Sequence, residues 1–202
     1  TWSEVEGSTT GNPIGMSSAI SFSGTGELDN GVGVTLSIDH DDKNAYSASQ
    51  IKMDFPGLGA ISIDQGAGGT GLDRIDDMAP TAWEETNGTA VGTGAQTVTG
   101  VGGTNNVEFD VSSDMLPEGM SLQIAHSPKA GGTAANDKGS SGDSPVGSGW
   151  DIVFQHSGLT EGLNVFGGFS TIEQSSVRAQ NDRRQVAAGA TYAMGGITVG
   201  YE

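Results

Sequence analysis

The side chains that could do chemistry in this sequence are mainly carboxylates. They are densest between residues 71 and 86, in the stretch GLDRIDDMAPTAWEET. Acids grouped in this way can attract cations or bind them weakly, and they can also serve only to keep a loop solvated. The candidate residues of this stretch are Asp73, Arg74, Asp76, Asp77, Glu84 and Glu85. Covalent catalysis is not indicated, because no G-x-S-x-G motif and no set of Ser, His and Asp stands out.

Metal and nucleotide sites are not indicated either. The stretch DHDDKN begins like a calcium loop, but Lys43 takes a ligand position, Asn44 replaces the required Gly and Gln50 replaces the closing Glu. The histidines lack the spacing of a zinc site, and there is no cysteine. The stretches GAGGTG and GVGG lack the strand-to-helix setting of a nucleotide loop. We therefore expect no metal and no cofactor.

Composition excludes several classes of protein. The formal net charge is −17, from 25 acids and 8 bases, so the phosphates of nucleic acid would be repelled. Gly occurs 34 times in 202 residues without a Gly-x-y period, which excludes collagen. No run of 18 apolar residues exists that could form a transmembrane helix. The chain begins TWSEVEG, without a secretory signal, and we expect either a mature protein or an internal piece of a longer one.

Period-two alternation of apolar and polar residues predicts ten β-strands and no helix. The predicted strands lie within residues 16–28, 32–39, 49–55, 60–64, 106–113, 120–126, 149–157, 162–172, 184–194 and 196–201. Val153, Phe166 and Ile172 break the alternation in their strands. The connections between the strands alternate strictly between short and long, and the longest spans residues 65–105. This order is typical of an antiparallel up-and-down sheet, with short turns at one end and long loops at the other.

One face of the predicted sheet is polar and often charged. The charged residues on it are Asp39, Lys52, Asp54, Asp64, Glu108, Asp110 and Asp151. The other face is apolar and needs a cover, yet the chain supplies no helix and no second layer. A closed transmembrane β-barrel solves this problem, because its apolar face meets lipid and its polar face meets a water-filled lumen. Hydrophobic residues make up only 34% of the chain, a low value that we expect for this fold.

The whole chain resembles the Gram-negative general porins of marine and other α-proteobacteria. The resemblance rests on LDNGVGVTLSID, on FPGLGAISIDQG running into the acidic stretch, and on the repeated unit of turn, Gly and alternation. It implies a barrel of sixteen strands, of which this chain would hold the second to the eleventh. It also implies a homotrimer in the outer membrane, in contact with lipid and lipopolysaccharide. We therefore expect one β-barrel domain over residues 1–202, as a segment of a longer chain.

The same resemblance assigns roles to the charged residues. Residues 65–105 would be the third external loop, folded into the pore, and the six candidates of residues 71–86 would form the constriction. The pore wall would carry Lys52, Asp54, Asp64, Glu108, Asp110, Arg183 and Arg184. Bases are scarcer here than the family usually shows, which favours a wide pore that prefers cations. A solvated acidic loop, without a role in a pore, remains the alternative for residues 71–86.

The expected function is passive diffusion of small hydrophilic solutes and ions across an outer membrane, with no enzymatic activity. An acidic, β-rich structural or adhesion protein of the cell surface is the first alternative, and it would bury the apolar face against protein. A barrel-based hydrolase is the second alternative, but it needs a Ser-His pair that we cannot place.

Overall fold

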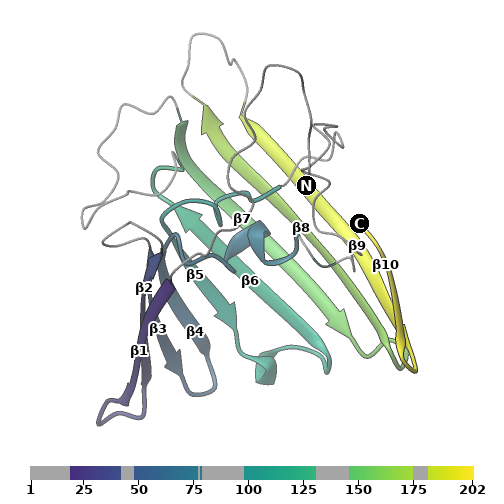
Figure 1. Ribbon diagram of the computed structural model, residues 1–202, viewed down its shortest axis with the longest axis horizontal. Coiled ribbons are helices and arrows are strands. Elements are labelled where there is room, and N and C mark those ends of the chain that lie inside the picture. Colours follow the sequence, from purple (N-terminus) through teal and green to yellow (C-terminus); the bar gives the residue numbers. More distant parts are fainter. Residues whose placement is uncertain (1–18, 42–47, 77, 79–97, 131–145, 175–181) are drawn as a thin grey trace, which may run out of the picture.

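A computed structural model describes residues 19–41, 48–76, 78, 98–130, 146–174 and 182–202. These residues form ten strands in one antiparallel sheet, whose spatial order is the order of the sequence (Figure 1). The strands are β1 (Ala19–Glu27), β2 (Gly33–Asp41), β3 (Ala48–Phe55), β4 (Gly59–Gln65), β5 (Asn106–Val111), β6 (Met120–Ser127), β7 (Val146–Ser157), β8 (Leu163–Gln174), β9 (Arg183–Met194) and β10 (Ile197–Tyr201). The predicted all-β, up-and-down sheet is confirmed.

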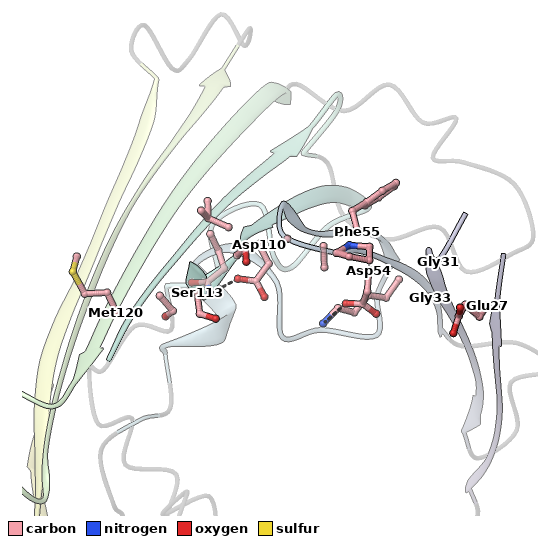
Figure 2. Close-up of a pocket in the computed structure, with 16 residues that line it drawn as sticks. Glu27, Gly31, Gly33, Asp54, Phe55, Asp110, Ser113 and Met120 are labelled. Atoms are coloured by element: carbon pink, nitrogen blue, oxygen red, sulfur yellow. Dashed lines mark hydrogen bonds and ion pairs between the residues drawn. The ribbon is translucent and has the colours of Figure 1, made fainter. Parts of the chain in front are cut away.

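The sheet is open, and β1 and β10 form its two edges. It is strongly curved, with one concave and one convex face (Figures 1 and 2). All the short connections lie at one end of the sheet, at the bottom of Figure 1. Two 3₁₀ helices occur in the described residues, η1 (Gly71–Arg74) and η2 (Ser113–Met115). Neither of them is long or apolar enough to cross a membrane.

The convex face carries a continuous apolar row. Cross-strand partners on this face, in order from β2 to β9, are Val34, Met53, Ile61, Phe109, Ile124, Ile152, Phe169 and Val186. β-branched and aromatic side chains suit a pleated surface, so each neighbouring pair also favours the sheet locally. The row is nevertheless open to its surroundings: Ile152 is 49% exposed and Val186 is 67% exposed.

The concave face is polar, and its middle is the most deeply buried part of the described chain. Its fully or nearly fully buried residues include Ser62, Asp64, Asn106, Glu108, Asp151 and Ser170. A soluble protein shows the reverse, with apolar side chains inside and charged ones almost never fully buried. The sheet is therefore inverted relative to an ordinary soluble fold.

Two small apolar clusters explain the breaks in alternation. Leu72 and Ile75, from the long β4–β5 connection, pack against Val153, Phe166 and Ala187 of the concave face. Val101, near the end of the same connection, belongs to a second cluster with Ala125, Ala130 and Ile172. Val153, Phe166 and Ile172 therefore point inward because the connection covers them. In Figure 1, η1 lies against the middle of the sheet, where it contacts β6, β7 and β8.

The turn before β6 provides a test of the strand arrangement. Gly119 has a φ of +80°, and a Cβ there would lie 2.0 Å from the carbonyl oxygen of Ser157. Gly31, in the β1–β2 turn, has a φ of +82°, but a Cβ there would meet only open space. Both Ala substitutions bring left-handed strain, of about 1–2 kcal/mol. Only Gly119→Ala must also displace Ser157, whose N–H donates to the Gly119 carbonyl at 2.8 Å.

We expect Gly119→Ala to lower the free energy of unfolding by roughly 2 kcal/mol more than Gly31→Ala. Urea unfolding in detergent, followed by far-ultraviolet circular dichroism, measures the difference. Equal losses for the two variants would show that β6 and β7 do not meet at Gly119 in this way.

Candidate functional site

The candidate site is the part of the polar concave face against which the β4–β5 connection packs. We call this surface the seat of the connection. The connection leaves β4 through a glycine-rich stretch, turns through η1 and returns to β5. Gly71 at the start of η1 has a φ of +54°, and a Cβ there would lie 2.5 Å from Oδ2 of Asp151. Glycine at this position therefore allows both the left-handed backbone and the close approach to the carboxylate.

Asp151 on β7 joins the two ends of the connection. Its side chain is fully buried, and its Oδ2 accepts hydrogen bonds from the Leu72 N–H at 2.8 Å and the Val101 N–H at 2.9 Å. A buried carboxylate is strongly destabilising unless donors replace its water, and backbone N–H groups are effective donors to a charged oxygen. Oδ2 of Asp151 therefore satisfies two N–H groups of the connection, and these N–H groups replace water at that oxygen.

Glu108 on β5 holds η1 from a second direction. It is 1% exposed, and its Oε2 accepts a hydrogen bond of 2.6 Å from the Gly71 N–H. Its Oε1 accepts a hydrogen bond from the Arg74 guanidinium, so the two side chains form an ion pair. Removing one partner of a buried ion pair leaves an uncompensated charge, which is strongly destabilising. The ion pair therefore fixes η1 on the sheet.

The side of the seat nearest β4 is held by amide side chains. Asn106 donates through Nδ2 to Thr70 Oγ1 at 2.8 Å and to the Thr104 carbonyl at 2.9 Å. Asp64, 2% exposed, accepts a hydrogen bond of 3.0 Å from Gln50 Nε2 on the neighbouring strand. Together with Glu108 and Asp151, these contacts make the polar face a complementary surface for the backbone of the connection.

The residues assigned to the constriction fall into two groups. Asp73, Arg74 and Asp76 lie in the described part of the connection, with Arg74 bound to Glu108 and Asp73 accepting a 3.0 Å hydrogen bond from the Gly69 N–H. Residues Gly71–Arg74 of this stretch form the 3₁₀ helix η1. The remaining candidates, Asp77, Glu84 and Glu85, lie outside the described residues.

The residues assigned to the pore wall occupy three environments. Lys52, Asp54 and Asp110 line a pocket on the concave face near the short turns, shown in Figure 2. Asp64 and Glu108 were expected to border water, but both are buried. The Gly71 N–H and Arg74 of the connection donate to Glu108, and Gln50 of β3 donates to Asp64.

The two arginines of β9 point to opposite faces. Arg183 pairs with Ile172 on the concave face, whereas Arg184 pairs with Thr171 on the face of the apolar row. Asp151 was placed on the polar face by alternation alone and was given no role. The nearby break at Val153 was the sequence signal that something covers this part of β7.

The described part of the connection is held on the polar concave surface by hydrogen bonds to Asp151 and Glu108 and from Asn106. Within the described residues, no group of three or more His, Cys, Asp or Glu side chains is placed to hold a metal ion. A scan of the chain against models of protein families finds no match, and a search of curated protein sequences finds none.

The two hydrogen bonds that Asp151 accepts from the connection give a direct test of how the connection is held. Asp151→Ala removes the acceptor of two buried N–H groups, each of which costs about 1–3 kcal/mol when left unpaired. We expect the amides of Leu72 and Val101 to exchange with deuterium at least about 30-fold faster, which corresponds to roughly 2 kcal/mol of lost local stability. Hydrogen exchange with mass spectrometry measures this.

Asp54→Ala is the matched control, because its side chain is 54% exposed and no N–H of the connection is bonded to it in the described residues. Exchange in residues 71–76 and 98–104 should then stay at the native rate. Unchanged exchange in Asp151→Ala would mean that the carboxylate does not hold the connection.

Proposed function

We propose that this chain is the greater part of an outer-membrane porin, through which small hydrophilic solutes and ions diffuse passively. The observation that carries the proposal is the inversion of the sheet, with a continuous apolar row on the convex face and buried or water-facing polar groups on the concave face. Lipid hydrocarbon is the environment in which such a convex face is stable, and a closed barrel leaves no unpaired strand edge in it.

The limits of the apolar band support a membrane position. Toward the end of the sheet that carries the long connections, the next row of cross-strand partners on the convex face contains His126, Trp150, Thr171 and Arg184. Trp150 is 51% exposed and stacks on His126, with ring centroids 4.0 Å apart. Indole rings and arginines favour the boundary between hydrocarbon and water. This row is therefore a candidate for one membrane interface.

Tyr192 marks the other side of the band, near the short turn that joins β9 to β10. It lies eight residues after Arg184 on the same strand, or about 27 Å along the strand and about 20 Å along the membrane normal at a tilt of about 40°. Outer-membrane barrels have an apolar band about 25 Å tall. The band therefore has a suitable height.

Closure into a porin-sized barrel requires more strands than the ten described here, because barrel diameter grows with strand number. We propose that further strands of a longer chain join the edges at β1 and β10, and that three such barrels associate as a trimer. The seated β4–β5 connection narrows the lumen. The excess of acids over bases gives the pore a preference for cations.

The test is conductance of the native full-length protein in planar lipid bilayers under a salt gradient. We expect ohmic channels whose reversal potential shows a preference for cations. Asp73→Asn combined with Asp76→Asn should move the reversal potential toward zero, because it removes two charges from the segment that narrows the pore. Asp114→Asn, at an exposed acid of η2, is the control and should leave the reversal potential near the native value.

The alternative of a surface structural protein predicts a different result. Its apolar row would be buried against protein, so it would stay soluble without detergent and would leave bilayers silent. Absence of channels at high protein dose, together with solubility in plain buffer, would overturn the porin proposal.

A further inference from the structure

A row of acids crosses the concave face close to the short turns. In one register row from β1 to β6, the cross-strand partners are Glu27, Gly33, Asp54, Ala60, Asp110 and Gln123. Acids occupy every second strand of this row, and the residues between them are small. Because neighbouring strands lie about 4.8 Å apart, successive carboxylates are about 10 Å apart. The small residues leave open space between the acids.

That space is a pocket of about 620 Å³, within the range of small-molecule sites. Figure 2 shows Asp54 and Asp110 on the concave side of the sheet and the Phe55 ring on the opposite side. Three carboxylates line the pocket against one ammonium, that of Lys52, whose Nζ lies 3.6 Å from Asp54 Oδ1. The charge of the pocket therefore favours a cation.

Gln123 supplies an independent indication of a ligand. It lines the same pocket and is only 4% exposed, and its Nε2 donates to Asp110 Oδ1 at 2.9 Å. Its Oε1 is buried and has no hydrogen-bond partner among the described residues. A buried amide oxygen without a donor is unfavourable and calls for an explanation. Because this oxygen has almost no accessible surface, a donor brought by a ligand satisfies it only once the amide group turns toward the pocket.

We propose that this pocket is a binding subsite for small organic cations that carry N–H donors, such as a guanidinium or a primary ammonium group. The ligand donates to the Asp110 carboxylate and, once the Gln123 side chain turns toward the pocket, to the amide oxygen on the neighbouring strand; Asp54 adds a second negative charge. A planar guanidinium presents several donors in a fixed fork, which suits adjacent acceptors. Lys52 competes with the ligand for Asp54.

The spacing of the row favours an organic cation over a metal ion. A calcium ion needs oxygens at about 2.3–2.6 Å, so that two carboxylates must converge on one point. Here the register holds Asp54 and Asp110 on strands separated by β4. An organic cation several ångströms across can contact both sides of the pocket, with its N–H groups directed at the acceptors.

The experiment is a ligand-detected NMR titration of the native full-length protein in detergent, with methylguanidinium as the probe. Tetramethylammonium has the same charge and no N–H donor, and calcium chloride tests for a metal site. We expect methylguanidinium to bind saturably. As a competitor, tetramethylammonium should displace the bound probe at least about tenfold less effectively than unlabelled methylguanidinium does. Displacement by calcium at lower concentration than methylguanidinium would overturn the proposal.

Three variants locate the binding. Asp110→Asn should weaken the binding of methylguanidinium at least about tenfold. Lys52→Gln should strengthen the binding of methylguanidinium severalfold, a gain that misfolding cannot produce. Asp114→Asn, at an exposed acid of the same end of the sheet that does not line the pocket, should change nothing. Equal weakening by Asp110→Asn and Asp114→Asn would mean that only the general acidic field attracts the cation.

The inference rests on the proposed function in one respect, that the concave face is open to water. The two can fail separately. Channels without saturable binding would overturn the subsite and leave the porin proposal standing. Saturable binding with the variant pattern above, in a protein that forms no channels, would support the subsite and overturn the porin proposal.

Discussion

The structure depends on one constraint, which is that successive residues of a strand point to opposite faces of a single-layer sheet. Ten paired strands therefore sort their side chains into two surfaces without any other layer. In this chain the sorting places the apolar row on the convex face and the carboxylates on the concave face. A shift of one residue in the pairing of any strand would move its apolar side chains to the concave face and its polar side chains to the convex face.

The β4–β5 connection is the second organising feature, because it covers part of the concave face and turns it into a buried polar surface. Asp151 and Glu108 would be highly unfavourable beneath it without donors, and the connection would leave unpaired N–H groups without them. Each side therefore requires the other. The mutual dependence gives the connection one defined position on the sheet, as its proposed role in narrowing a pore requires.

The strands and their order could be predicted from sequence because the alternation is long and the connections alternate in length. The burial of Asp64 and Glu108 could not, because it depends on which distant backbone N–H groups reach them. Val153, Phe166 and Ile172 were visible as breaks in the pattern, yet their cause was a contact with residues far away in the chain. Arg183 and Arg184 illustrate the opposite case, since adjacent strand residues must face opposite ways once the start of β9 is known.

The central claim is that the convex row meets hydrocarbon and the concave row meets water. The protein has no cysteine, so single-cysteine nitroxide labels can be placed without background. Electron paramagnetic resonance in lipid vesicles would compare two sets of labels. The first set lies on the convex face, at Ile124, Ile152 and Phe169. The second set lies on the concave face, at the cross-strand partners Ser121 and Gln155. The account predicts that the first set is accessible to oxygen and shielded from a water-soluble relaxation agent, and that the second set shows the reverse. Access of the water-soluble agent to the first set would contradict it.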